Sequence, residues 1–114
     1  MADDKELRKT AEALLEPGEQ LISYTAGIFG TSTSQTLVVL TSKQIHVAAA
    51  AGGPKIPFSN IRSVSWASAW ARLNIDLKSP RKRLVFSIYG GDWKQHAKDL
   101  AEKAMTLLGS PSIR

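Results

Sequence analysis

The strongest constraint on the fold is one stretch near the end of the chain, residues 84–108, where a strand, a glycine turn and a helix are expected in succession. Leu84, Phe86 and Ile88 alternate with their neighbours, a pattern typical of a strand with one buried face. Gly90-Gly91 then ends the strand, because glycine pairs of this kind favour turns.

The helix expected after this turn has a single apolar stripe. Asp92 and Gln95 have the spacing of a capping box, which predicts that Asp92 caps the helix. Apolar residues then recur every three or four positions: Trp93, Ala97, Leu100, Ala104, Leu107 and Leu108. At about 1.5 Å per residue the stripe is roughly 24 Å long, so it needs an apolar partner surface.

The upstream sequence supplies that surface as strands. Six short strands are predicted before the last one, over residues 20–25, 36–40, 44–48, 55–58, 61–66 and 73–77. Pro57 places its strand at a sheet edge or at a bulge, because proline cannot donate to a strand ladder. The short turns exclude a parallel sheet, which needs long crossovers. We therefore predict an α+β fold, in which seven antiparallel strands form a bent sheet or partly open barrel capped by the C-terminal helix.

The chain length and ends indicate how the molecule is organised. We expect an N-terminal helix and turn over residues 1–18, the main domain over 19–108 and a short tail over 109–114. No run of about 18 apolar residues occurs, and the N-terminus lacks the order of a signal peptide, so a cytoplasmic protein is expected. The absence of cysteine excludes disulfides and thiolate metal sites.

The positive charge of the chain is unevenly distributed. The net charge is +5, yet the first twenty residues contain six acidic and three basic side chains. The remaining chain is therefore strongly basic, which favours an anionic partner such as acidic lipid, nucleic acid or an acidic protein surface. Solubility is an equally good explanation, since a basic surface alone selects no partner.

The sequence argues against catalysis, a metal site or a cofactor. His46 and His96 are isolated, and neither has a second ligand at metal-binding spacing. The Gly27–Gly30 segment is expected to form a loop, but it lacks the lysine and hydroxyl residue of a phosphate-binding loop. We therefore expect a protein that is not an enzyme.

One predicted turn concentrates the basic residues: Lys78, Arg81, Lys82 and Arg83. Each basic side chain near an anionic membrane contributes about 1 kcal/mol, so this turn could hold the protein weakly at a lipid surface. The alternative is an exposed turn kept soluble by its charge. Nucleic acid is a third possibility, although only Trp66 and Trp70 could serve as stacking surfaces.

Three apolar side chains are predicted in exposed segments. Ile28 and Phe29 lie in the expected first loop, and Trp70 lies in the turn before residue 73. A large ring in a turn favours an interface, whereas Trp66 is in phase with Val64 and is expected in the core. These three residues are the predicted interface.

Four short motifs resemble those of the bacterial pleckstrin-homology-like (PH-like) domains called YokE-like. They are Glu16-Pro-Gly-Glu19, Leu40-Thr-Ser-Lys-Gln44, Lys55-Ile-Pro-Phe-Ser-Asn-Ile61 and the terminal helix over residues 92–108. Many relatives carry arginine where this chain has Gln44. The segment Gly27–Gln35 also contains no Lys or Arg, although phosphoinositide-binding PH domains place basic residues there.

This resemblance implies a binding role. It places Lys55 at the same open end of the barrel as the basic turn, and it implies a tendency toward ring-like homo-oligomers. We therefore expect a PH-like module for protein–protein interaction or homo-oligomeric assembly. The alternative is peripheral binding to anionic lipid through Lys55 and the basic turn, and weak nucleic-acid binding ranks third.

Overall fold

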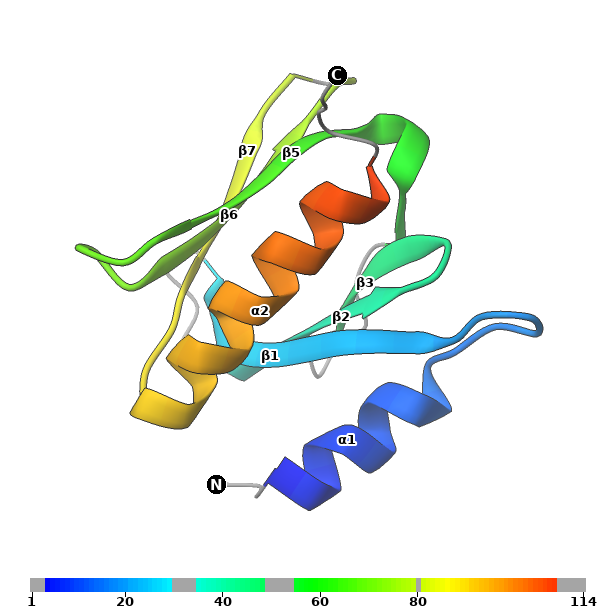
Figure 1. Ribbon diagram of the computed structural model, residues 1–114, viewed down its shortest axis with the longest axis horizontal. Helices are drawn as coiled ribbons and strands as arrows, with labels where there is room; N and C mark the ends of the chain where they lie inside the picture. Colours follow the sequence, from blue (N-terminus) through cyan, green and yellow to red (C-terminus); the bar gives the residue numbers. More distant parts are fainter. Residues whose placement is uncertain (1–3, 30–34, 49–54, 80, 109–114) are drawn as a thin grey trace.

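The sheet and two helices are shown in Figure 1, a computed structural model that describes residues 4–29, 35–48, 55–79 and 81–108. The elements are α1 (Asp4–Ala13), β1 (Leu21–Phe29), β2 (Gln35–Thr41), β3 (Gln44–Ala48), β4 (Lys55–Pro57), the 3-10 turn η1 (Phe58–Asn60), β5 (Ile61–Ala67), β6 (Arg72–Leu77), β7 (Arg83–Ser87) and α2 (Gly91–Leu107). The seven strands form one antiparallel sheet in the order β4-β3-β2-β1-β7-β6-β5. The predicted α+β architecture is confirmed.

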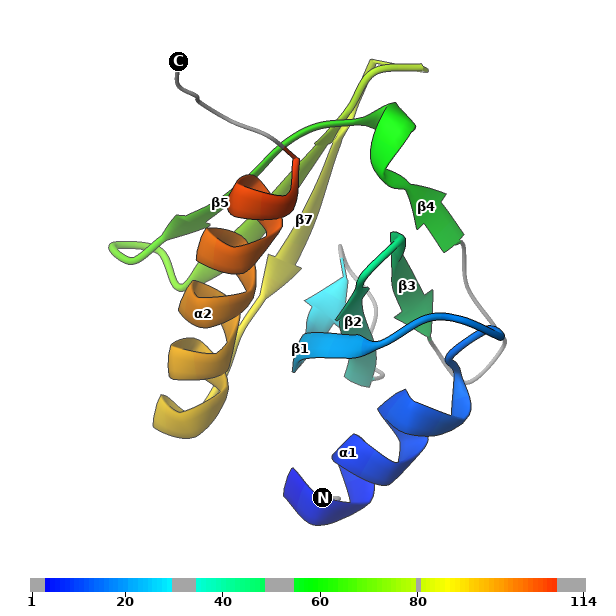
Figure 2. The same ribbon diagram turned by 45° about the vertical axis from the view of Figure 1, so that its right-hand side comes forward.

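The C-terminal helix covers the concave side of this sheet. Figures 1 and 2 show α2 lying along the sheet, while α1 packs separately against β1 and β2. The buried side chains of α2 are Trp93, Ala97, Leu100, Ala101 and Ala104, so most of the predicted stripe is confirmed. Leu107 is an exception because its side chain is 41% exposed. The strands contribute alternating residues to the same core, including Leu73 and Ile75, which are both fully buried.

The sheet bends where β1 changes partners. Most of β1 pairs with β2, but its last residues also pair with β7, so that Ile28 lies opposite Ser87. A Cβ atom on Gly27 would lie 2.6 Å from Ile88 Cδ1 and 2.8 Å from the Ser87 carbonyl oxygen, closer than real Cβ contacts. Glycine is therefore needed for β1 and β7 to approach one another. The prediction of a loop beginning at Gly27 was wrong, because these strand pairings extend β1 to Phe29.

The start of α2 also differs from the prediction. The helix begins at Gly91, and its N-cap is Gly90, which has a φ of 93° and makes no side-chain capping hydrogen bond. Glycine adopts this left-handed conformation without steric cost. Asp92 is therefore not the cap that its sequence spacing indicated. Its carboxylate lies in the first turn, where the helix dipole favours negative charge.

The predicted edge strand is confirmed. The first strand in the sheet order is β4, whose Pro57 lies opposite Gln44 of β3. Proline at this place leaves one fewer backbone donor on the open edge. The opposite edge is β5, where the Val64 amide donates to the Met105 sulfur of α2 at 3.2 Å. Helix α2 thus covers part of that edge.

Candidate functional site

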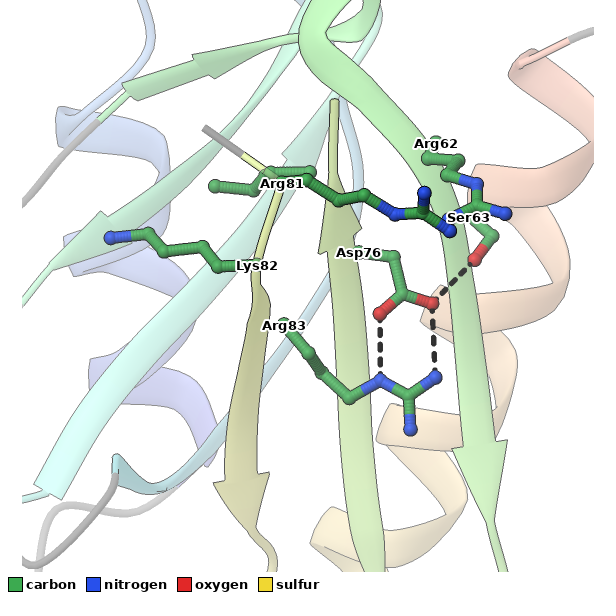
Figure 3. Close-up of a pocket in the computed structure, with 7 residues that line it drawn as sticks. Arg62, Ser63, Asp76, Arg81, Lys82 and Arg83 are labelled. Carbon is green, nitrogen blue, oxygen red and sulfur yellow. Dashed lines mark hydrogen bonds and ion pairs between the residues drawn. The ribbon is translucent and has the colours of Figure 1, made fainter. Parts of the chain in front are cut away.

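A basic pocket lies on the outer face of the sheet, across β5, β6 and the start of β7 (Figure 3). Its lining residues are Arg62, Ser63, Asp76, Leu77, Arg81, Lys82 and Arg83, and its volume is about 530 Å³. Ser63 and Arg83 each lie opposite Asp76 in the strand register, so all three project from the same face. The neighbours of Asp76 on β6, Ile75 and Leu77, are buried on the other face. The pocket is therefore separate from the core.

The carboxylate of Asp76 is at the centre of this pocket. Arg83 donates to it through Nε at 2.6 Å and Nη2 at 3.3 Å, and the Ser63 hydroxyl donates at 2.9 Å (Figure 3). The hydrogen bond from Arg83 is the main cause that lowers the pKa of Asp76; burial opposes it, while Ser63 and the charge of Arg62 add to the lowering. The Arg83 guanidinium, predicted to bind an anionic partner, is thus already paired with a carboxylate.

Arg62 completes the pocket. Strict alternation along β5 would place Arg62 on the same face as Val64, but the pairing register shifts between Ile61 and Ser63. Because of this irregularity Ile61 and Val64 are buried and Arg62 is exposed. Arg62 and Arg81 reach toward the same side of Asp76, whereas Lys82 extends in the opposite direction (Figure 3). No signal for the bulge exists in the sequence pattern.

The other predicted basic residues lie outside the pocket lining. The Lys55 ammonium is 2.6 Å from a carboxylate oxygen of Glu16, and this hydrogen bond is the largest cause lowering the pKa of Glu16. Lys78 is exposed, and its backbone amide donates to the Asn60 carbonyl. The structure therefore brings Arg81, Lys82 and Arg83 together but does not bring Lys55 to them.

A second polar cluster surrounds Glu19, whose side chain is fully buried. Its carboxylate accepts hydrogen bonds from the Thr41 hydroxyl at 2.8 Å and the Gln44 amide at 2.9 Å, and it lies 3.1 Å from His46 Nε2. The Glu16 backbone amide also donates to it at 2.7 Å. Burial by itself would raise the pKa of Glu19, but these hydrogen bonds together lower it to about 2.

This cluster stabilises the join between the N-terminal segment and the β2–β3 hairpin. His46, which looked isolated in the sequence, is a buried partner of Glu19 twenty-seven positions away. Long-range pairs of this kind leave no local sequence signal. Within the described ranges there is no group of three His, Cys, Asp or Glu side chains that could hold a metal ion.

Exposed aromatic rings gather where the β5–β6 turn meets the end of β7. Trp70 is 73% exposed and Tyr89 is 64% exposed. The Ile88 amide donates to the Ala71 carbonyl at 2.9 Å. Because Ala71 follows Trp70 and Ile88 precedes Tyr89, this hydrogen bond holds the two backbone segments side by side. Ala71 has a φ of 51°, an uncommon conformation for a residue with a Cβ atom. The side chains of Trp70 and Tyr89 are called the aromatic corner below.

The other two predicted interface residues lie in β1 rather than in a loop. Ile28 is half-buried, and Phe29 is 40% exposed with its ring centroid 5.1 Å from that of Phe86. Phe29 therefore packs partly on a core residue. Trp66 is half-buried and packs against the core, as expected from its phase in β5. Trp70 remains the most exposed of the large apolar residues in the part of the chain that the structure describes.

Three solved structures share this arrangement of strands and helices. The C-terminal domain of an unknown protein from Leishmania infantum has a TM-score of 0.62 and 13% identity, covering 92% of this chain and 96% of that one. The linker-DH/PH domains of p115-RhoGEF have a TM-score of 0.60 and 8% identity over 98% of this chain, which spans 37% of that structure. The hSac2 domain from the human phosphoinositide phosphatase Sac2 has a TM-score of 0.58 and 11% identity, covering 94% and 84%.

The fold is PH-like. The identities are low, so the likeness extends to the fold alone. No protein-family profile matches the sequence, and no curated protein matches it either. No helix among the described residues is long and apolar enough to cross a membrane.

Proposed function

We propose that this PH-like module acts through protein–protein interaction and that it assembles into a homo-oligomer. The observation that carries the proposal is the aromatic corner, where Trp70 and Tyr89 expose most of their rings on adjacent segments. Monomeric proteins seldom leave such large rings in water, and tryptophan and tyrosine are among the residues that contribute most to interfaces. A second copy of the chain would cover both rings. The motifs that resemble those of YokE-like domains support the same proposal.

Sedimentation equilibrium at micromolar concentration tests this proposal. We expect the wild-type protein to exceed the 12.4 kDa mass of one chain, and we expect Trp70→Ser to shift the mass toward the monomer. Leu107→Ser is the matched control, because Leu107 is an exposed apolar side chain on α2. A wild-type mass of one chain would rule out homo-oligomeric assembly. An oligomer that Trp70→Ser leaves intact would place the interface elsewhere.

Peripheral binding to anionic surfaces is the second candidate function. The basic pocket favours it, because the guanidinium groups of Arg62 and Arg81 lie beside an Asp76 carboxylate that Arg83 already pairs (Figure 3). Nucleic-acid binding has less support. No Trp, Tyr or Phe is among the residues that line the pocket, so it offers no platform for base stacking.

A further inference from the structure

Two guanidinium groups in the basic pocket have no ion-pair or hydrogen-bond partner among the described residues. The Asp76 carboxylate accepts hydrogen bonds from Arg83 and Ser63, and the Arg83 guanidinium compensates its negative charge. Arg62 and Arg81, in contrast, make no ion pair or side-chain hydrogen bond with any residue in the described ranges. Both line the pocket and reach toward the same side of Asp76 (Figure 3). The pocket therefore has positive charge in excess and donors without a protein acceptor.

The geometry of these groups favours one class of ligand. A guanidinium presents a planar fork of N–H donors that matches the oxygens of carboxylate or phosphate. A carboxylate has two oxygens and one charge, which a single arginine can satisfy. A phosphomonoester has three terminal oxygens and a charge between −1.5 and −2 near neutral pH, so it can accept from two arginines, one on β5 and one in the segment before β7. A volume of about 530 Å³ leaves room for the group and part of its substituent.

We propose that Arg62 and Arg81 form a binding site for a phosphomonoester group on the outer face of β5, β6 and β7. Arg83 has a positioning role in this site: it neutralises Asp76, which would otherwise repel the anion. This inference gives the second candidate function a ligand chemistry and does not depend on self-association. None of the residues that line the pocket belongs to the Gly27–Gln35 segment, where the PH resemblance would put a ligand.

The rival explanation is non-specific attraction to a basic turn, and the chain supplies matched controls for it. Lys82 is adjacent to Arg81 and has the same charge, but it extends away from Asp76 (Figure 3). Arg72 is an exposed arginine on β6, four residues from Asp76 and hence roughly 13 Å along the strand. Non-specific attraction predicts that removing the charge of Arg62, Arg81, Lys82 or Arg72 lowers the affinity for phosphate by similar factors. A specific site predicts that, of these four, only Arg62 and Arg81 are needed for full affinity.

Titration of the ¹⁵N-labelled protein with inorganic phosphate at constant ionic strength tests the site. We expect saturable shifts of the amide signals of Ser63 and Asp76 in the wild type. Arg62→Ala and Arg81→Ala should each weaken binding about tenfold, the loss expected for a hydrogen bond to a charged group. Arg81→Lys should also weaken it, because lysine keeps the charge but loses the fork. Lys82→Ala and Arg72→Ala should change the affinity by less than about twofold.

Two outcomes would overturn the proposal. One is a wild-type titration that does not saturate, and the other is a loss at Lys82→Ala equal to that at Arg81→Ala. All of these residues are exposed, and an unchanged amide spectrum away from the pocket verifies that each variant is folded. The titration is repeated on Trp70→Ser, so that failure of self-association and failure of the phosphate site are observed separately.

Vesicle co-sedimentation then distinguishes a lipid headgroup from a soluble phosphate compound. Phosphatidylcholine vesicles are prepared with phosphatidic acid, which has a phosphomonoester, or with phosphatidylglycerol, which has a phosphodiester, at matched surface charge. Preference for phosphatidic acid that Arg81→Ala removes would assign the site to a membrane lipid. Saturable phosphate binding with no such preference would assign it to a soluble phosphomonoester.

Discussion

Glu19 is the single residue for which the structure predicts the strongest dependence on pH. Its pKa is about 2 in the folded protein, compared with 4.5 for an ordinary glutamate. A carboxyl group with a lowered pKa stabilises the fold above its unfolded pKa, and this stabilisation is lost as the pH falls through the folded value. The contribution of Glu19 should therefore be complete above about pH 4.5 and should disappear toward pH 2.

We predict that Glu19→Gln lowers the free energy of unfolding at neutral pH by about 2 to 3 kcal/mol, because the buried charge-assisted hydrogen bonds are lost. Urea denaturation between pH 2 and pH 7 measures this difference, which should shrink as the pH falls below about 4.5. Glu12→Gln is the control, since Glu12 is exposed in α1 and lies 3.7 Å from Arg8 on the same helix. A stability difference that is constant with pH would contradict the assigned role of the Glu19 carboxylate.

At the residue scale, the sequence indicated where basic side chains concentrate but not how the charged side chains pair. The basic turn does contain Arg81 and Lys82 at the surface, as composition indicated. The sequence could not show that the Arg83 guanidinium binds Asp76 or that Lys55 binds Glu16, thirty-nine positions away. Such ion pairs depend on strand register and loop geometry, and a one-residue bulge was sufficient to bring Arg62 into the pocket.

Among Gly18, Gly27, Gly90 and Gly91, Gly27 has the least space for a side chain, because β1 approaches β7 there. We predict that Gly27→Ala destabilises the protein by about 1 to 3 kcal/mol, because the new methyl group would meet Ile88 and the Ser87 carbonyl oxygen. Thermal unfolding followed by circular dichroism measures the loss. Gly91→Ala is the control, since a Cβ atom at the first residue of α2 would meet nothing within 4 Å.

The control variant is expected to be neutral or slightly stabilising, by up to about 1 kcal/mol, because alanine restricts the unfolded chain. Equal unfolding temperatures for Gly27→Ala and the wild type would show that the two strands can separate without cost. That result would weaken the explanation of how the sheet bends.

Helices and strands were predicted best where one face is buried and the other is exposed to solvent. Leu73, Ile75 and Leu77 alternate with polar residues, and the structure buries all three. The end of β1 and the start of α2 were predicted less well. Backbone pairing with β7 extends β1 through Phe29, and Gly90 rather than Asp92 is the N-cap of α2. Element ends depend on tertiary pairing and on backbone conformation, which the hydrophobic pattern does not record.

At the scale of the whole molecule, the proposed interface and the proposed phosphate site lie at opposite ends of the same strands, β6 and β7. The aromatic corner lies at the β5–β6 turn and the end of β7, whereas the pocket lies where β6 ends and β7 begins. Arg72 and Asp76 are at opposite ends of β6, which illustrates this separation along one strand. An oligomer formed through the aromatic corner can therefore keep the pocket of each copy accessible.

Assembly and membrane binding should then be coupled through multivalency alone. An oligomer that presents several phosphate sites to one vesicle gains apparent affinity without any new contact. We predict that Trp70→Ser lowers the apparent affinity for phosphatidic-acid vesicles by about tenfold or more. Its affinity for inorganic phosphate should be unchanged, whereas Arg81→Ala should weaken both interactions and leave the oligomer mass unchanged.

Vesicle co-sedimentation, phosphate titration and sedimentation equilibrium of the wild type, Trp70→Ser and Arg81→Ala provide the measurements. If Trp70→Ser weakened phosphate binding as much as vesicle binding, the aromatic corner would be shaping the pocket itself. If monomerisation left vesicle binding unchanged, the copies could not engage one surface together. In that second case the pockets of an oligomer must face different directions, because sites that face a common plane cannot avoid the gain from multivalency.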